Sequence, residues 1–451
     1  AVSHPHVFAV GDCAHLDHAP RPKAGVYAVR EAPVLFENLR TALAEDGRMK
    51  PYRPQTDYLK LISTGRRHAI ANRSFITLTG GWLWRLKDRI DRDFMDRLRD
   101  LSAMPPARPA RMAAGLEDAL RPGEMPCAGC GAKLARATLQ PALAAITNPH
   151  RGDIAAGPGD DAAVLEIGGV RQVITTDHLR AFSDDPYLMA RIAAVHALGD
   201  IWAMGARPQA ALASLVLPHA SPAIQAEMLG EVMAGAGEIF AAAGATIAGG
   251  HTSMGAEMTL GFTVTGLLER DPILQSGARP GDRLIATRPI GTGVILAAEM
   301  RGKADARDVA AAWESMSRPL GPAAEILAPQ ARAMTDITGF GLAGHLMAML
   351  EASGVSARID LSAVSLLPGA EALAAAGIRS SLWPENAAIE GVSRPEGPRS
   401  DLLFDPQTAG GLLAALPADA ADSVLTRLED IGEPAALIGE IGEGPARLDV
   451  S

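Results

Sequence analysis

The chain from residue 123 to the C-terminus alternates apolar, strand-like runs with Ala-rich helical stretches. This alternation restricts the fold to the α/β and α+β classes, in which helices cover a sheet. A Pro-rich segment at Ala103–Arg111 comes before it and predicts a linker over 103–122. A second half begins near Arg279. We therefore expect one domain before the linker and two after it, over residues 1–102, 123–275 and 276–451.

Net charge and cysteine content exclude several classes of protein. The formal net charge of -10 argues against a general nucleic-acid binder, because such proteins carry a basic face. Three cysteines are too few for a disulfide framework, so we expect a cytoplasmic protein. No run of about 18 apolar residues is present, so we expect no stable membrane insertion. Because the chain starts at Ala1 rather than Met, we expect it to begin inside a larger protein.

The strongest chemical feature is the loop Cys127-Ala-Gly-Cys130, followed by Lys133. The Cys-x-x-Cys spacing is typical of redox and zinc sites. A structural zinc site needs four ligands, and the sequence has no second cysteine pair; a thioredoxin-like context is also missing. We therefore favour a single nucleophilic thiolate at Cys130, assisted by the cation of Lys133.

Four aspartates follow this loop, each beside glycine or small polar residues near the expected end of an element. Any one of them is more often a cap or turn former than a ligand. Four together predict a site for Mg²⁺ and nucleotide phosphates, because Mg²⁺ prefers carboxylate and phosphate oxygens. The sequence contains neither a Walker A loop nor a kinase Gly-rich signature, so it does not indicate a common nucleotide-binding fold. These aspartates are Asp161, Asp177, Asp200 and Asp336.

The segment Gly249-Gly-His-Thr252 has two interpretations of equal weight. Its backbone amides could hold phosphate, or it could be a tight turn after a strand. A histidine in a turn or on a helix is usually structural, and we expect this of His251 and His345. The other elements predicted by pattern are strands at 58–64, 68–71, 74–78, 173–177, 210–217, 246–248 and 259–268, and helices at 82–101, 187–204 and 222–243.

Seven segments of residues 123–451 together resemble the selenide, water dikinase (selenophosphate synthetase) family, in the family's order. The resemblance implies conversion of ATP, selenide and water to selenophosphate, AMP and phosphate. It also implies the two-domain fold shared with aminoimidazole ribonucleotide synthetase, and a homodimer with ATP near the subunit interface. The segments are Cys130–Lys133, Gly159–Val164, Thr175–Asp177, Leu198–Gly205, Ala248–Thr252, Met334–Leu346 and Asp405–Gly411.

The resemblance implies a role for each matching residue. Cys130 is the catalytic cysteine, and Lys133 is its partner and contacts ATP. Asp161, Asp200 and Asp336 are implied Mg²⁺ ligands. Many relatives have a second cysteine where this chain has Ala132, which leaves the role of Cys127 open. The implied nucleotide-binding residues are Lys133, Pro158, Gly159, Asp160, Asp177, Asp200, Gly250, His251 and Thr252.

The first hundred residues carry a second resemblance. Val7–Asp12, predicted to be a strand, and the helical Pro22–Leu39 resemble the second flavin-binding motif of FAD-dependent NADH-dehydrogenase-like oxidoreductases. In that family the aspartate, here Asp12, contacts FAD; it could also simply cap the helix. The Gly-rich phosphate fingerprint is absent, so FAD binding would need a missing N-terminal part. The helix at 82–101 is either a membrane-surface helix or one packed on its own domain.

Three rival functions remain at the level of sequence. One is another ATP-using enzyme of the same fold, such as a thiamine-phosphate kinase or a purine-pathway synthetase, which is not expected to have the Cys-Gly-x-Lys loop. Another is an FAD-dependent NADH oxidoreductase with a regulatory C-terminal part. The third is a selenium or metal carrier without catalysis, which would leave the aspartates unexplained.

Overall fold

A computed structural model gives the fold of the chain. It describes residues 7–44, 48–99, 127–134, 151–156 and 159–451, together with residues 4, 138, 139 and 145. The predicted linker at 103–122 and Pro158 lie outside the described residues. Two compact units are present: Ala1–Gly123 with Ala220–Gln225, and Glu124–His219 with Ala226–Ser451. The finer domain limits stay predictions.

The first unit contains a small antiparallel sheet with a helix on it. Its strands follow the order β1-β2-β3, as the three short apolar runs predicted, and α2 packs on β2 around Leu83. The strand predicted at Val7–Asp12 is wrong: Gly11–Cys13 is a 3₁₀ turn, and residues 7–10 join no strand of the described sheets. The elements are η1 Gly11–Cys13, α1 Gly25–Ala44, β1 Lys60–Gly65, β2 His68–Arg73, β3 Ile76–Gly80 and α2 Gly81–Arg99.

The α2 helix is strongly amphipathic. Leu83 is 2% exposed, whereas Trp82, Ile90 and Phe94 remain exposed on the same helix. The expected packing of this helix on its own domain is therefore confirmed for one face. Among the helices that the structure describes, none is both long enough and apolar enough to cross a membrane.

The second unit begins with a six-stranded sheet of order β4-β5-β6-β9-β7-β8. Its pairs are antiparallel except β7 with β8, which is parallel. Strands were predicted over parts of β6, β7, β8 and β9, and all four form. The bounds are β4 Ile154–Ala156, β5 Ala163–Ile167, β6 Val170–Arg180, β7 Arg207–Pro218, β8 Thr246–Gly255 and β9 Thr259–Leu268.

Pairing with neighbouring strands changes three details of the prediction. The β6 strand continues past Asp177 to Arg180, because β9 pairs with it along its whole length. The β7 strand buries only one face rather than both. No turn forms at Gly249–His251, because β8 continues to pair with β7 through this segment. Gly250 suits that pairing, since a Cβ there would lie 2.2 Å from the carbonyl oxygen of Ala213.

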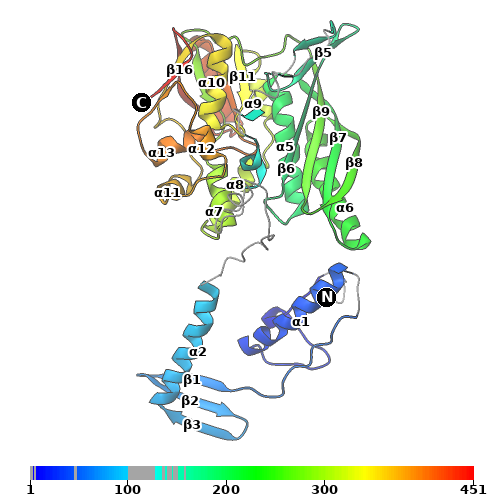
Figure 1. Ribbon diagram of the computed structural model, residues 1–451, viewed down its shortest axis with the longest axis vertical. Helices are drawn as coiled ribbons and strands as arrows, with labels where there is room; N and C mark the ends of the chain where they lie inside the picture. The colour runs from blue at the N-terminus through cyan, green and yellow to red at the C-terminus, as the bar shows by residue number, and fades with distance from the viewer. Residues whose placement is uncertain are drawn as a thin grey trace. The chain divides into compact units, whose positions relative to one another are not determined.

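The helix α5 (Pro186–Ala203) is the centre of the second unit. Asp185 caps it by accepting a hydrogen bond from the Leu188 amide at 3.0 Å, and Pro186 occupies its first turn. The residues from Ile192 to Ala203 are all buried, because the helix packs on β6 and β9 and also on β11 of the following sheet (Figure 1). The predictions of this helix and of α6 (Pro222–Ala242) are confirmed.

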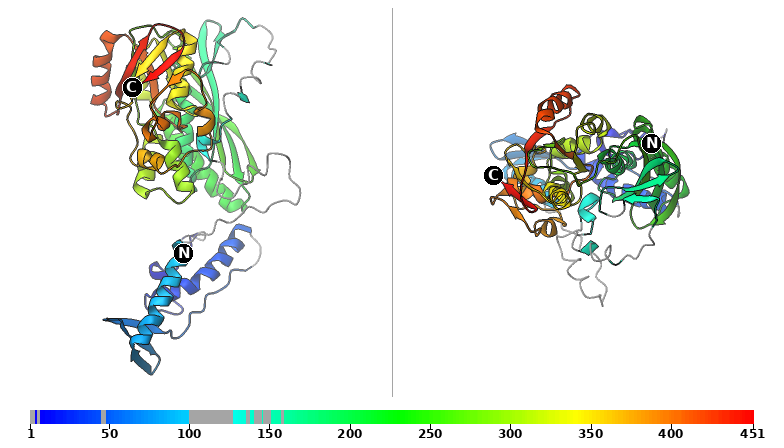
Figure 2. Two further views of the ribbon diagram at one scale, coloured as in Figure 1. Left: turned by 60° about the vertical axis from the view of Figure 1, so that its left-hand side comes forward. Right: turned by 90° about the horizontal axis from the view of Figure 1, so that it is seen from above.

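A seven-stranded mixed sheet of order β11-β14-β10-β15-β12-β16-β13 completes the unit, with α14 on its outer side (Figure 2). Its strands are β10 Arg283–Ala286, β11 Ala333–Asp336, β12 Ser356–Ile359, β13 Val392–Ser393, β14 Leu412–Leu416, β15 Ala436–Gly442 and β16 Arg447–Val450. The helices are α7 Thr292–Met300, α8 Ala306–Met316, α9 Gly321–Leu327, α10 Gly341–Ser353, α11 Ala370–Ala375, α12 Trp383–Asn386, α13 Pro398–Asp401, η3 Leu402–Phe404 and α14 Ala418–Asp430.

Candidate active site

Three of the predicted aspartates meet between the two sheets of the second unit. Asp161 comes just before β5, Asp200 lies on α5, and Asp336 ends β11. Each offers a carboxylate oxygen, and these oxygens lie within 4.8 Å of one another. The approach depends on Gly199, because a Cβ there would lie 2.5 Å from Oδ2 of Asp336. The fold thus brings together carboxylates that are far apart in the sequence.

Uncharged side chains donate hydrogen bonds to some of the carboxylate oxygens of this cluster. Oδ1 of Asp161 accepts hydrogen bonds from Thr335 Oγ1 at 2.8 Å and from Gln275 Nε2 at 3.0 Å. Oδ2 of Asp200 accepts one from Thr175 Oγ1 at 2.5 Å. Oδ2 of Asp161 is buried and has no hydrogen-bond partner among the described residues. A buried carboxylate oxygen without a donor is costly, and a cation beside it removes that cost.

The electrostatics of the cluster also fit a cation. Burial first, and then repulsion from a neighbouring aspartate, raise the pKa of Asp161, Asp200 and Asp336 well above the ordinary range. Lys133 opposes this shift at Asp200 and Asp336, but it is outweighed, and buried carboxylates in such surroundings hold protons. A bound divalent cation would supply the further positive charge that this cluster needs, and an all-oxygen donor set suits Mg²⁺.

The Cys130 loop is a short 3₁₀ turn, η2 (Gly129–Ala132), fastened to the C-terminal half of the unit. Cys130 is completely buried, and its amide donates a hydrogen bond to Thr408 Oγ1 at 3.1 Å. Gly129 has φ of +59°, and a Cβ there would lie 2.7 Å from the same hydroxyl. Glycine is therefore needed both for the turn and for the close approach.

Cys127 anchors the other end of this loop. Its amide donates to Ser381 Oγ at 3.0 Å, and the Ser381 amide donates to the Cys127 sulfur at 3.3 Å. The Ser381 hydroxyl donates in turn to the carbonyl of Gly131 at 3.0 Å. Two of these bonds hold Cys127 and the third holds Gly131, so Cys127 docks the loop, whereas the sequence left its role open.

A chain of polar groups connects Cys130 to Lys133. The Cys130 sulfur lies 3.4 Å from Nε2 of His196, and the same nitrogen lies 3.5 Å from Oδ2 of Asp177. The other carboxylate oxygen of Asp177 lies 3.4 Å from Nζ of Lys133. Burial opposes a charged ammonium, but the Asp177 carboxylate raises the pKa of Lys133 above its ordinary value. Lys133 is therefore a permanent cation in this site.

The charge state of the Cys130 side chain differs from the sequence prediction. A thiolate was expected at Cys130, but burial raises the pKa of this cysteine to about 12, and the nearby Lys133 only partly offsets the shift. The resting group is a neutral thiol.

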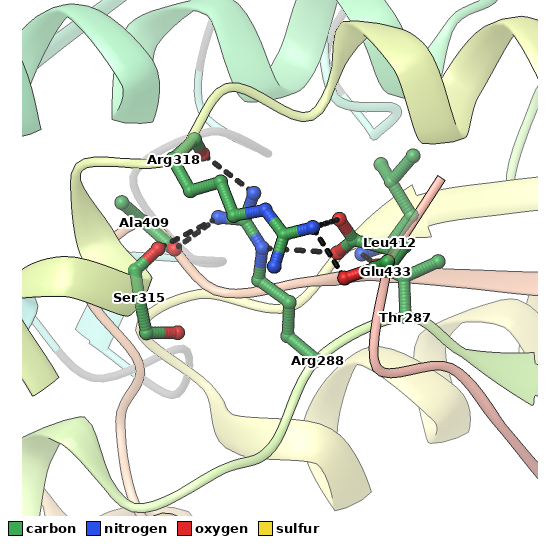
Figure 3. A network of polar contacts seen from close by, with 8 residues as sticks. Thr287, Arg288, Ser315, Arg318, Ala409, Leu412 and Glu433 are labelled. Carbon is green, nitrogen blue, oxygen red and sulfur yellow. Dashed lines mark hydrogen bonds and ion pairs between the residues drawn. The ribbon is translucent and has the colours of Figure 1, made fainter. Parts of the chain in front are cut away.

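Ala409, the residue after Thr408, is held by the arginine of a buried ion pair (Figure 3). The Arg288 guanidinium lies 3.3 Å from the Glu433 carboxylate, and both side chains are at most 3% exposed. Arg288 also donates to the carbonyl of Ala409 at 3.4 Å. Ala409 has φ of +45°, which is uncommon for a residue with a side chain. The ion pair thus supports the strained position next to Thr408, to which the Cys130 loop is fastened.

The structure does not gather all the predicted nucleotide-binding residues. Asp160 Oδ1 accepts a hydrogen bond from the Gln275 amide at 2.9 Å, next to the aspartate cluster, and Gly159 is exposed. Gly250, His251 and Thr252 are exposed on β8, which β9 and β7 separate from β6. Three strand spacings of ~4.8 Å place β8 roughly 14 Å from β6 within one sheet.

Family profiles match most of the second unit. Residues 159–268 match the AIR synthase related protein, N-terminal domain, and residues 279–450 match the AIR synthase related protein, C-terminal domain. A selenide, water dikinase of Geobacter metallireducens is 39% identical over 330 residues, covering 70% of this chain and 94% of that protein. A selenide, water dikinase of Burkholderia pseudomallei is 37% identical over 342 residues, covering 72% of this chain and 94% of that protein. The chain belongs to the selenide, water dikinase family.

The solved structures agree with this fold. Thiamine-monophosphate kinase from Stenotrophomonas maltophilia is similar with a TM-score of 0.52 at 21% identity, covering 67% of this chain and 92% of that one. At this identity the likeness speaks for the fold alone. The expected aminoimidazole ribonucleotide synthetase-like fold is confirmed, and the chain is an enzyme of the selenide, water dikinase family. The relatives do not favour the flavin oxidoreductase alternative.

The sequence did not predict three residues that contact the site, namely His196, Gln275 and Thr335. His196 lies one helical turn before Asp200 on α5, so i,i+4 spacing was a signal that could have found it. Gln275 reaches Asp161 from 114 residues away, and no local pattern marks it. Thr335 lies in the Met334–Leu346 segment, but the resemblance assigned it no role. His345 is structural, as expected: its Nε2 accepts a hydrogen bond from the Thr338 amide at 3.1 Å.

Proposed function

We propose that this chain synthesises selenophosphate from ATP, selenide and water and releases AMP and phosphate. The observation that carries the proposal is the position of Lys133 and Cys130. The charge of Lys133 interacts with Asp177, Asp200 and Asp336, and the Cys130 thiol lies beside it. This arrangement occurs in a chain that is 39% identical to a selenide, water dikinase over 94% of that protein.

Asp161, Asp200 and Asp336 are the residues that would hold Mg²⁺. The ion would supply positive charge that stabilises the phosphate oxygens during cleavage of both ATP anhydrides. Thr175, Thr335 and Gln275 position the carboxylates by donating hydrogen bonds to them. The unpaired Asp161 oxygen in this cluster supports the assignment.

Lys133 and Asp177 have separate tasks in this proposal. The Lys133 ammonium neutralises charge that develops on the phosphates, and its ion pair with Asp177 fixes its position at 3.4 Å. Cys130 supplies a soft sulfur for selenium chemistry and is shielded from water by its complete burial. Asp160 and Gly159 lie on the loop beside the cluster, where they contribute to binding ATP.

We also propose that the functional unit is a homodimer formed through the six-stranded sheet. Leu212 of β7 is 49% exposed and Met254 of β8 is 63% exposed, and β8 is one of the two edge strands of that sheet. Exposed apolar side chains on an exposed sheet edge favour association. Gly250, His251 and Thr252 on β8 would then reach nucleotide at the interface between subunits. Light scattering of the purified protein tests this: a monomeric mass argues against it.

The first unit does not by itself fit FAD. Asp12 is exposed, and the Gly11 amide donates to the Glu31 carboxylate at 2.5 Å rather than remaining free for a ligand. We therefore derive no reaction step through FAD. We place the enzyme in the cytoplasm, because Cys13, Cys127 and Cys130 are all free thiols.

Phosphorus NMR of ATP turnover with and without selenide tests the proposed reaction. We expect AMP, phosphate and selenophosphate only when selenide is present. Cys130→Ser should abolish this turnover, whereas Cys13→Ser, a change at an exposed cysteine of the first unit, should leave it unchanged. Turnover of Cys130→Ser at the wild-type rate would refute the assigned role of Cys130.

A further inference from the structure

The buried thiol of Cys130 faces a histidine that neither the sequence motifs nor the proposed reaction uses. His196 is 1% exposed, and its Nε2 lies 3.4 Å from the Cys130 sulfur. The histidine comes from the central helix α5, whereas the cysteine comes from a loop 66 residues away. The contact therefore depends on the docked position of the Cys130 loop.

The same nitrogen of His196 also faces a carboxylate. Oδ2 of Asp177 lies 3.5 Å from Nε2, and Lys133 binds the other oxygen of Asp177. Nδ1 of His196 is buried without a hydrogen-bond partner among the described residues. All polar contacts of the imidazole are thus at Nε2, between the sulfur and the carboxylate.

The surrounding groups determine the resting charges. Asp177 and His178 of β6 and Lys133 of the loop act on His196, but burial is the dominant influence and lowers the pKa of His196 to about 4. The imidazole therefore rests neutral and is a weak base, so the proton leaves the thiol only as the sulfur reacts. Burial keeps Cys130 a neutral thiol, and a buried thiol needs a nearby base before its sulfur can react.

We propose that His196 accepts the proton of the Cys130 thiol when the sulfur reacts. The S–H bond breaks, its electron pair stays on sulfur, and the proton forms an N–H bond at Nε2. Asp177 then stabilises the imidazolium, and Lys133 stabilises the negative charge on sulfur. The inference rests on the proposed function in one respect: it takes Cys130 as the reacting group.

A purely structural role is the alternative. A buried imidazole can fill space between α5 and β6 and hold the loop by a hydrogen bond without accepting a proton. The two roles differ in their dependence on pH. Loss of a base is compensated when hydroxide becomes abundant, whereas loss of packing lowers the rate by the same factor at every pH.

The test compares His196→Gln with His219→Gln, which makes the same change at an exposed histidine of the same unit. Glutamine keeps a polar group of similar length but is not a base. The more compact His196→Asn is a second variant if glutamine prevents folding. Thermal unfolding of each variant verifies that the fold is retained.

The first readout does not depend on activity. The S–H stretching band of Cys130 is obtained by infrared difference spectroscopy between the wild-type protein and Cys130→Ser. We expect this band at lower frequency in the wild type than in His196→Gln, because imidazole nitrogen is a stronger acceptor than an amide. An identical band in both proteins would overturn the contact, and with it the inference.

The second readout is the pH profile of selenide-dependent AMP formation. We expect His196→Gln to lower kcat about a hundredfold near neutral pH, with KM for ATP unchanged and a smaller deficit at alkaline pH. His219→Gln should match the wild type. A deficit of constant size at every pH, or no deficit, would overturn the inference. Absence of turnover in the wild type would refute the proposed function instead, and with it the assignment of Cys130 as the reacting group, whereas the infrared comparison would still test the contact between His196 and Cys130.

Discussion

Replacing Asp336 by asparagine has opposite effects on the metal-free and the Mg²⁺-bound protein. Three carboxylates share a buried space in which their oxygens lie within 4.8 Å of one another. Asparagine keeps the size and polarity of Asp336 but removes its charge. We expect Asp336→Asn to stabilise the second unit when no metal is present and to weaken its stabilisation by Mg²⁺.

The size of the first effect follows from the geometry. Two charges 4.8 Å apart repel by about 3 kcal/mol at an effective dielectric constant of about 20. The protein can avoid this repulsion by protonating a carboxyl, but at pH 7 that costs about 4 kcal/mol for a group with an ordinary pKa of 3.8. Either way, the third carboxylate destabilises the metal-free fold by about 3–4 kcal/mol, which asparagine relieves.

Thermal unfolding in a chelator and in excess Mg²⁺ measures both effects. In the chelator, Tm of Asp336→Asn should exceed that of the wild type by several degrees. The increase in Tm caused by Mg²⁺ should be large in the wild type and small in the variant. Asp422→Asn, a matched change at an exposed position of α14, should alter neither value. A lower Tm in the chelator, or a full response to Mg²⁺, would refute the cluster as a metal site.

Three further predictions concern other parts of the chain. Burial raises the pKa of Asp405 to about 7. The contribution of this carboxyl to the free energy of unfolding is therefore complete below its unfolded pKa near 4 and is lost as pH rises through 7. Asp405→Asn should remove about 4 kcal/mol of that pH dependence in denaturant titrations. Gly250→Ala should lower Tm because its Cβ meets a carbonyl oxygen, whereas Gly230→Ala, with open space on α6, should add about 1 kcal/mol of stability. The purified chain should be colourless, since the Gly-rich flavin fingerprint is absent; a flavin absorption spectrum would contradict this.

The sequence predicted the members of the metal cluster but not their surroundings. Asp161, Asp200 and Asp336 each stand in a motif that contains glycine, and for Asp200 the reason is visible: a larger residue at Gly199 would strike the Asp336 carboxylate. Gln275 has no such marking, and Thr335 stands in a motif without an assigned role, because the contacts of both with Asp161 depend on packing between the two sheets. Periodicity likewise predicted α5 and α6, whose helical spacing is local information.

The errors in the prediction came from long-range effects. Val7–Val10 has the composition of a strand but pairs with none of the described strands, and pairing is what defines a strand in a sheet. Gly249 and Gly250 suggested a turn, yet β7 holds them in an extended strand. The charge state of Cys130 was predicted from its neighbour Lys133 alone, whereas burial of the whole loop has the larger effect.

The attachment of the Cys130 loop has a consequence for the order in which the enzyme is assembled during synthesis. The loop is fastened by Ser381 and Thr408, which follow their partners by 254 and 278 residues in the chain. Contacts of such long sequence separation form late, and a growing chain cannot make them before those residues leave the ribosome. The thiol therefore stays outside its pocket until the segment around Thr408 has left the ribosome. A polypeptide that ends before Thr408 would hold the aspartates and the lysine, but its cysteine would lack its anchor.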